Sequence, residues 1–214
     1  MVVTGAARAF SAGADSEVLK QATGGIRSGL GSGRPMGHAL TVRKLTIAAI
    51  NGGCAGIGFF QALCCDVRFA ASDAKITSAF LRRGIPPEFG AGWLLARIVG
   101  AGHAADLLLS ARTITGADAQ AIGLVTRAVE RADLLSTVHD YARDVAANCS
   151  PRALAYGKAE LRAAAERSYE EAARVALELY DRPGHDEDFG EGVRSFVERR
   201  PPAFADLEPR SNSQ

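Results

Sequence analysis

Two glycine-rich segments, 9–15 (AFSAGAD) and 51–58 (NGGCAGIG), have residue types and spacing that indicate chemistry. The second joins an apolar run of strand length, 45–50, to an apolar run of helix length, 56–65. Glycines there let the backbone approach a ligand closely, and the first N–H groups of a helix have no intrahelical acceptor. Such groups stabilise an anionic oxygen. The segments therefore predict an oxyanion site built from backbone N–H groups, or, as the alternative, tight packing alone.

The second segment does not match the glycine-rich motifs of dinucleotide-binding or phosphate-binding sites. The string GIG lacks the full GxGxxG spacing of a dinucleotide site, and no GK[ST] is present for a P-loop. The cysteines include no CxxC pair, and the histidines are far apart in the sequence. We therefore expect reduced core thiols, packed or surface histidines, and no metal site. These residues are Cys54, Cys64, Cys65, Cys149, His38, His103, His139 and His185.

The elements that would position these segments mix strands and helices up to residue 130. Residues 2–4, 66–71 and 124–129 are predicted strands besides 45–50, because each is short and apolar or β-branched. We therefore expect an α/β fold, with a core over residues 1–130 and a helical region over residues 131–214. Amphipathic helices are predicted at 133–148, 151–166, 168–181 and 187–199.

Two loops stand between these elements. Residues 20–40 are rich in Gly and Ser, which predicts a surface loop that is either a lid over a site or a plain linker. Residues 84–92 (GIPPEFGAG) form a turn-rich loop with one acid, Glu88. The pattern after this loop predicts helices at 93–98 and 103–110, separated at Gly100, and a capping box of Thr115 and Asp118.

Composition excludes several function classes. The chain has 214 residues, with 25 Lys+Arg against 24 Asp+Glu, so no electrostatic attraction to nucleic acid is expected. Hydrophobic residues make up 47% and charged residues 23%, as in one globular domain with room for an appendage. No apolar stretch reaches the about 20 residues of a membrane span. The start, MVVTGAARAF, lacks the regions of a signal peptide. We expect a cytoplasmic protein with no membrane partner.

Five strings, in order along nearly the whole chain, resemble the crotonase, or enoyl-CoA hydratase/isomerase, superfamily. The resemblance implies a ClpP/crotonase-like α/β spiral of ββα units and C-terminal helices that assemble a homotrimer or a dimer of trimers. It also implies an acyl-CoA thioester substrate and no separate cofactor, because coenzyme A is part of the substrate. The strings are VVTGAARAFSAGAD (2–15), KLTIAAINGGCAGIGFFQALCCDVRFAASDAKI (44–76), RRGIPPEFGAGWLLARIVG (82–100), ARTITGADAQAIGLVTRAV (111–129) and EDFGEGVRSFVERRPPAF (187–204).

Carried over to this sequence, the resemblance gives an oxyanion hole formed by the backbone N–H groups of Ser11 and Ile57. These donors would stabilise the thioester enolate that forms when a proton leaves the α or γ carbon. The resemblance places further residues around the coenzyme A: Ala9, Ser11 and Ala14 along its adenine and pantetheine, Gly56 at the close backbone approach, and Asp15 as an acceptor that fixes its loop.

Two departures from the family pattern bear on the reaction. Phe60 and Phe80 occupy the positions of the two glutamates that hold and activate water in a typical hydratase of the family. Phenylalanine cannot transfer a proton, so hydration by two carboxylates is not available. The resemblance instead gives Glu88 as the catalytic acid and base, because isomerase-type members use an acid in this loop. Phe89 and Trp93, with Phe60 and Phe80, are its expected neighbours and would raise its pKa; the alternative is an exposed loop acid.

The sequence therefore favours an enoyl-CoA isomerase. The alternatives are an enoyl-CoA hydratase with an unusual water-activating residue, an acyl-CoA or C–C bond hydrolase, and a non-catalytic acyl-CoA binder. The pair Phe60 and Phe80 favours a bulky hydrophobic acyl group. The family normally has a further strand–strand–helix unit before the strand ending at Thr4, and this sequence lacks it, as expected of a late start codon, a fragment or a natural truncation. If the unit is truly absent, we expect a sheet edge to be exposed.

Overall fold

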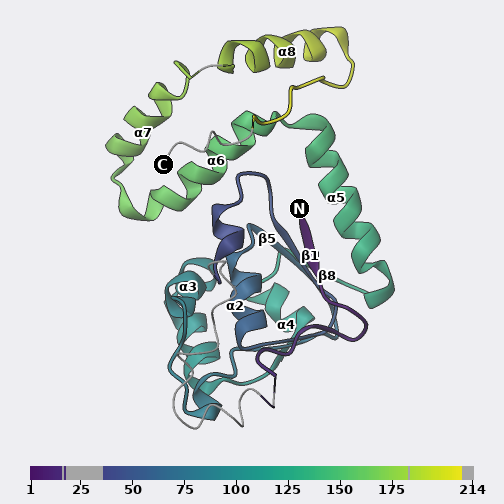
Figure 1. Ribbon diagram of the computed structural model, residues 1–214, viewed down its shortest axis with the longest axis vertical. Helices are drawn as coiled ribbons and strands as arrows, with labels where there is room; N and C mark the ends of the chain where they lie inside the picture. The colour runs from purple at the N-terminus through teal and green to yellow at the C-terminus, as the bar shows by residue number, and fades with distance from the viewer. Residues whose placement is uncertain (16, 18–35, 183, 209–214) are drawn as a thin grey trace. The chain divides into compact units, whose positions relative to one another are not determined.

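A computed structural model describes residues 1–15, 17, 36–182 and 184–208 (Figure 1). The chain forms two compact units. Unit 1 contains Met1–Val42 and Thr46–Val138, and unit 2 contains Arg43–Leu45 and His139–Gln214. The division falls within helix α5 (Leu134–Asn148). Most of the predicted loop 20–40 lies outside the described residues.

Unit 1 is built on two four-stranded sheets between which the chain passes repeatedly. The first has the strand order β1-β3-β5-β8, with all neighbours parallel. The second has the order β2-β4-β6-β7, and only β6 and β7 are antiparallel. Because β1, β3 and β5 are parallel, their carboxyl ends lie on the same side of the first sheet. The turns to β2, β4 and β6 all begin there. The strands are β1 (Val2–Thr4), β2 (Ala9–Ser11), β3 (Ile47–Ile50), β4 (Gly53–Ala55), β5 (Val67–Ala71), β6 (Lys75–Thr77), β7 (Ile114–Thr115) and β8 (Arg127–Val129).

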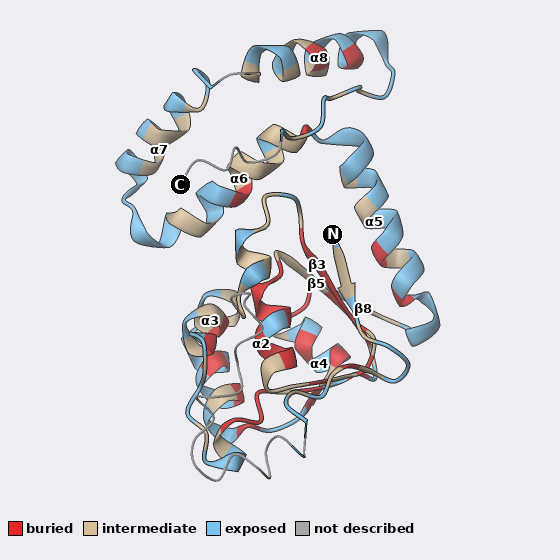
Figure 2. Cartoon of the chain, viewed as in Figure 1, coloured by how far each residue is buried: buried red, intermediate tan, exposed pale blue. Residues whose placement is uncertain are grey.

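The core of unit 1 lies where β3 and β5 meet helix α2 (Ile57–Cys64). Strand β3 lies between β1 and β5 and is fully buried, as its continuous apolar run predicts. Helix α2 is apolar apart from the exposed Gln61, and it buries Phe59 and Phe60 to 2% exposure each. Each such side chain stabilises the fold by roughly 1.5–3 kcal/mol. Figure 2 shows the buried residues concentrated in these elements.

Helix α3 (Ala91–Ser110) spans both of the helices predicted at 93–98 and 103–110, with a break at Gly100 (φ 76, ψ 164). It is the one described helix whose length and mean hydropathy would allow it to cross a membrane, which corrects the expectation that no stretch is long enough. Its Leu95 and Leu107 are buried, and a break at membrane depth would leave backbone groups unsatisfied. Length and composition alone therefore carry no membrane assignment.

The capping box at the start of helix α4 (Gly116–Ala121) forms as predicted. Asp118 Oδ2 accepts from Thr115 N (2.9 Å), and Thr115 Oγ1 accepts from Asp118 N (3.1 Å). Strand β8 is shorter than the predicted 124–129, because the amides of Leu124 and Val125 instead donate to Ala119 O at the end of α4. These two side chains are still buried.

Unit 2 is helical, as predicted. Ser150 caps α6 by accepting from Ala153 N (3.0 Å), and it donates to Asp188 Oδ2 (2.6 Å) on α8. Arg152 Nη1 donates to Asp188 Oδ1 (2.9 Å), so the half-buried carboxylate of Asp188 joins the starts of the two helices. The helices of unit 2 are the C-terminal part of α5, then α6 (Pro151–Ala163), η5 (Ala164–Glu166), α7 (Tyr169–Glu178) and α8 (His185–Glu198).

A buried carboxylate, Glu191 on α8, binds the segment that follows the helix. Arg200 donates to both of its oxygens (2.6 and 3.0 Å), and Ala203 N donates to Oε1 (2.7 Å). These bonds favour the ionised form and lower the pKa of Glu191 from 4.5 to about 2.

Candidate active site

The two glycine-rich segments come together where β2 ends and α2 begins. A Cβ added to Gly58 would lie 2.5 Å from the Cβ and the carbonyl oxygen of Ser11 and 2.7 Å from its Oγ. A Cβ added to Gly13 would lie 3.0 Å from Ala55 O and 3.7 Å from Ile57 N. Glycine is therefore required at position 58 for these two stretches of backbone to approach so closely.

Helix α2 presents its open N-terminus at this contact. Gly56 precedes the helix with φ 55 and ψ −120, a conformation that favours glycine, and no side chain caps the end. The first helical bond runs from Phe60 N to Gly56 O (3.0 Å). The amides of Ile57, Gly58 and Phe59 come before that bond and carry the partial positive charge of the helix end. An oxyanion placed here would be stabilised electrostatically.

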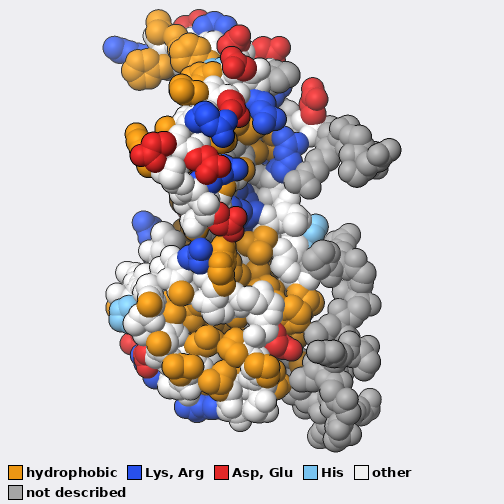
Figure 3. All heavy atoms as spheres, turned by 90° about the vertical axis from the view of Figure 1, so that its left-hand side faces the viewer, with side chains coloured by type: hydrophobic (Ala, Val, Ile, Leu, Met, Phe, Trp, Pro, Cys, Tyr) orange, Lys and Arg blue, Asp and Glu red, His pale blue; other side chains and the backbone are white. Residues whose placement is uncertain are grey.

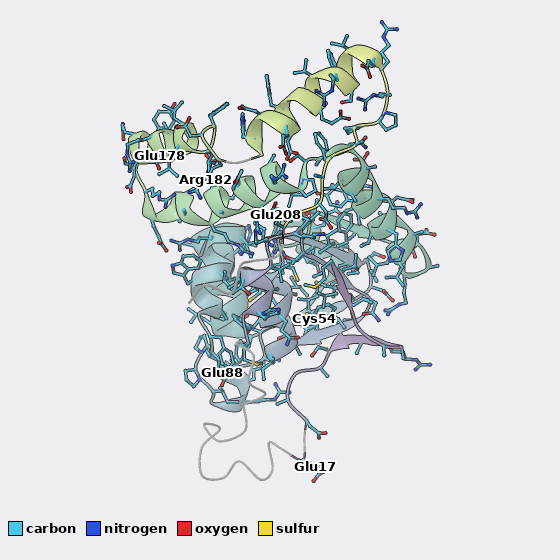
Figure 4. The ribbon with its side chains drawn as sticks, turned by 45° about the horizontal axis from the view of Figure 1, so that its top comes forward. Glu17, Cys54, Glu88, Glu178, Arg182 and Glu208 are labelled. Carbon is cyan, nitrogen blue, oxygen red and sulfur yellow. The ribbon has the colours of Figure 1, made fainter. Side chains whose placement is uncertain are left out.

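The segment after β2 is more exposed. Ala9 and Ser11 are half-buried, whereas Ala14 and Asp15 are exposed. Asp15 Oδ1 accepts from Glu17 N (2.9 Å), which is the loop contact expected of it. Figure 4 shows Glu17 at the outer end of this segment.

Cysteine chemistry is not available at this contact. Cys54 on β4 is fully buried, and burial raises the pKa of its thiol far above the ordinary value, so the thiolate nucleophile is disfavoured. Cys64 and Cys65 are also free and buried, whereas Cys149 is exposed, which corrects its expected place in the core. Among the described residues, no group of three or more His, Cys, Asp or Glu could hold a metal ion.

An apolar wall stands one turn along α2 from the helix start. Phe60 and Phe80 are 2% and 3% exposed. The Phe60 ring contacts the Phe89 ring, with centroids 5.3 Å apart and planes inclined by 38°. The end of the Phe60 ring also lies 3.8 Å from where a Cβ on Gly37 would stand. We call Phe60 and Phe89 the aromatic wall. Neither side chain can give or take a proton.

Glu88 is the residue directly before Phe89 in this wall. It is half-buried, and burial raises the pKa of its carboxyl. Its carbonyl oxygen accepts from Ala91 N (2.9 Å), while Phe89 (φ 53) and Gly90 (φ 78) take left-handed conformations that lead into α3. Figure 4 shows Glu88 at the α3 edge of unit 1. This turn therefore places the backbone of Glu88 directly beside Phe89 of the aromatic wall.

Trp93, another expected neighbour of Glu88, is 47% exposed. The guanidinium of Arg97 lies over its ring, 3.6 Å from the centroid. Figure 3 shows hydrophobic side chains gathered on the face of unit 1 that carries α3.

Sequence reasoning missed two features of this region. The first is the left-handed Phe89, since a bulky residue at positive φ is uncommon and gives no sequence signal. The second is the side chain of Asn51, which bonds the turn between β1 and β2. An Asn-Gly pair marks a turn, and that signal could have identified it.

The sequence model of a protein family, described as enoyl-CoA hydratase/isomerase, matches residues 1–208 of this chain. The chain belongs to this family. It is 33% identical over 204 residues to a Mycobacterium bovis protein named probable enoyl-CoA hydratase, covering 95% of this chain and 79% of the relative. It is 30% identical over 203 residues to the short-chain-enoyl-CoA hydratase of Clostridium acetobutylicum, covering 94% and 77%. A crystal structure titled as a probable enoyl-CoA hydratase/isomerase from Mycobacterium abscessus superposes with a TM-score of 0.85 at 30% identity, covering 96% and 80%.

These matches confirm the resemblance and the crotonase fold expected from the sequence. They identify the chain as an enoyl-CoA hydratase/isomerase family enzyme, whose substrates are acyl-CoA thioesters. The names of the relatives favour hydration, whereas Phe60 and Phe80 are not the carboxylates that hydration by two carboxylates requires.

Proposed function

We propose that this enzyme is an enoyl-CoA isomerase that shifts a double bond with a single carboxylate, Glu88. One observation carries the proposal: buried Phe60 packs on Phe89, and the half-buried Glu88 is attached to that aromatic wall. A carboxylate whose pKa is raised by burial is a stronger base once ionised. It also holds a returned proton more readily than an exposed acid does.

The reaction balances without any other reactant. The Glu88 carboxylate takes a proton from the α or γ carbon of the enoyl thioester, and the electron pair moves onto the thioester oxygen. The N–H groups of Ser11 and Ile57 hold the resulting dienolate oxygen. The protonated Glu88 then returns the proton to the other carbon, so the double bond moves and no atom is gained or lost. Each such oxyanion donor is worth roughly 3–4 kcal/mol of transition-state stabilisation.

Hydration is the second candidate, because the relatives described above are named hydratases. In that reaction Glu88 would hold and deprotonate a water that adds to the β carbon, and the α carbon would receive the proton. Phe60 and Phe80 disfavour this reaction, because neither side chain has a polar group that could hold the water.

A panel of enoyl-CoA thioesters distinguishes these reactions. The enzyme is incubated with 2-enoyl and 3-enoyl substrates. An isomerase gives products of unchanged mass. Their ultraviolet absorbance differs from that of the substrate, because conjugation with the thioester is gained or lost. A product heavier by one water would establish the hydratase and contradict the proposal. Release of free coenzyme A would indicate a hydrolase, and binding without turnover of any thioester would indicate a binder. Either result would also refute the isomerase.

A further inference from the structure

Three turns carry the chain from the first sheet to the second, and they lie at one edge of unit 1. They follow β1, β3 and β5 and lead into β2, β4 and β6. The turns pack backbone against backbone. A Cβ on Gly5 would lie 1.9 Å from Ala9 O, and a Cβ on Gly52 would lie 2.0 Å from Arg8 O. A shift of one turn therefore moves the strand beside it.

Asn51, at the end of β3, bonds the first turn with both ends of its amide. Its Oδ1 accepts from Gly5 N (3.2 Å) and from Thr4 Oγ1 (3.4 Å). Its Nδ2 donates to Gly5 O (3.1 Å) and to Ala7 O (3.2 Å). This side chain thus supplies partners to the turn from which β2 starts, where Ala7 itself has a left-handed φ of 50.

Arg131, at the start of η4 (Arg131–Asp133), joins the second and third turns. Its Nη1 donates to the carbonyl oxygen of Asn51. Its Nη2 lies 2.9 Å from both Asp73 carboxylate oxygens, in the turn between β5 and β6. The Arg131 guanidinium lowers the pKa of Asp73, so this carboxylate stays ionised at neutral pH. Asn51, Arg131 and Asp73 form what we call the turn clamp.

The clamp lies at one end of the two strands that reach the oxyanion donors. Strand β2 runs from Ala9 to Ser11, and strand β4 runs from Gly53 to Ala55, two residues before Ile57. Each strand is only three residues long, so its starting point sets where its other end lies. The β2–β4 pairing is itself irregular between Ala9 and Ser11.

We propose that Asn51 and Arg131 are positioning residues, which set the separation of the Ser11 and Ile57 amides by fixing the turns before β2 and β4. The inference rests on the proposed function in requiring that these amides bind the thioester oxygen. Neither side chain touches the substrate in this account. They act through the backbone of two short strands.

The test measures the thioester carbonyl directly. Difference infrared spectra of a bound enoyl-CoA labelled with carbon-13 at the thioester carbonyl report how strongly the two amides polarise that bond. Wild-type enzyme, Asn51→Ala and Arg131→Ala are compared, with Thr115→Ala as a matched control that removes a helix cap elsewhere in unit 1. Melting temperatures identify the range in which every variant is folded, and kcat and KM are measured within it.

We expect Asn51→Ala to lower kcat by about 10- to 100-fold with little change in KM, since a small misplacement of the donors weakens transition-state binding most. Its carbonyl frequency should move toward that of the free thioester. Arg131→Ala should change kcat and the carbonyl frequency less than Asn51→Ala does, because Asn51 still bonds the first turn. It also serves as the test if Asn51→Ala fails to fold. Asp73→Asn keeps an acceptor for Arg131 and should therefore retain most of the wild-type kcat and carbonyl frequency.

Two results would overturn the proposal, and they are distinguishable. If the wild-type carbonyl is polarised and both clamp variants match Thr115→Ala in frequency and kcat, the positioning role is wrong while the oxyanion hole stands. If the wild-type carbonyl itself matches the free thioester, no hole exists to be positioned. The proposed function then fails together with this inference.

Discussion

Glu88 lies in a defined turn and is partly buried, and both properties matter for proton transfer. The left-handed residues Phe89 and Gly90 fix the turn that follows it. Burial raises the pKa of the carboxyl, so the ionised form is less stable than in water and is more reactive as a base. Since only the ionised form can take a proton, activity should fall as pH decreases through this raised pKa.

We therefore predict that Glu88→Gln lowers kcat by roughly 10²–10⁴-fold while acyl-CoA binding is little changed. The wild-type enzyme should lose kcat on the acid side at a pH above the ordinary glutamate value of 4.5, and Glu88→Asp should keep that acid limb. Steady-state kinetics across pH measures both effects. Glu160→Gln, an exposed glutamate of α6, is the control. Wild-type turnover by Glu88→Gln would remove Glu88 from the mechanism.

The variant Glu88→Gln should not have a lower melting temperature than the wild-type protein at neutral pH. A carboxyl whose pKa is raised by folding contributes its full stabilisation below the unfolded pKa. That contribution is lost as pH rises through the folded pKa, so it is absent at neutral pH. Glutamine removes the charge and with it the cost of burying that charge.

At this scale the sequence could supply residue types but not backbone conformations. The resemblance places Phe60 and Phe80 where the family has two glutamates, and the structure shows both side chains to be buried. The left-handed Phe89, and the packing of its ring on Phe60, depend on contacts between segments distant in sequence. The cation–π contact between Arg97 and the Trp93 ring was likewise not predicted from the sequence.

In unit 1, strand β2 and helix α2 approach each other closely at Ser11 and Gly58. Any side chain at Gly58 would meet the Ser11 backbone, which cannot move without disturbing β2. We predict that Gly58→Ala separates the two amides and lowers kcat by at least about 10²-fold, as misplacement of a donor does. Steady-state kinetics measures this. Gly102→Ala is the matched control, because a Cβ at Gly102 has open space around it. Equal activity in the two variants would contradict the contact.

In unit 2, Glu191 gives a prediction about acid stability. Its pKa is lowered to about 2 chiefly by Arg200, so its stabilisation is complete above the unfolded value near 4.5 and is lost as pH falls through about 2. Glu191→Gln should lower the melting temperature at neutral pH and flatten its dependence between these pH values. Glu187→Gln on the same helix, whose side chain is 77% exposed, should do neither. Thermal unfolding across pH decides between these outcomes.

The element boundaries show where local patterns stop being sufficient. The capping box at Thr115 and the first helical residue of α6, Pro151, follow local rules, and both were predictable. Strand β8 was predicted too long because tertiary bonds from Leu124 and Val125 to the end of α4 override the strand tendency of that run.

For the whole molecule, the five family-like strings were enough to predict the fold through the resemblance, because they follow the family's order along nearly the whole chain. The spiral itself could not be derived from periodicity. It depends on the parallel register of β1, β3 and β5, which joins residues more than forty positions apart in the case of Val2 and Ile47.

The helices of unit 2 leave many large apolar side chains exposed on a single chain. Such a number is unusual for a monomer and is typical of a surface that another protein covers. Cyclic symmetry closes such surfaces between identical chains. The exposed side chains are Leu161, Tyr169, Leu177, Tyr180, Phe189, Val193, Phe196 and Val197.

We predict that the protein sediments as a trimer or a dimer of trimers, because copies of unit 2 would cover these side chains in the assembly. Phe196, at 84% exposure, provides the sharpest variant. Phe196→Glu would place an unpaired charge in an apolar interface and should shift the protein toward the monomer without lowering the thermal stability of unit 1. Leu109→Glu, an exposed position on α3 of unit 1, is the control for added surface charge. Sedimentation velocity over a range of concentrations measures the assembly. A wild-type protein that remains a stable monomer at micromolar concentration would show that these side chains do not serve self-assembly.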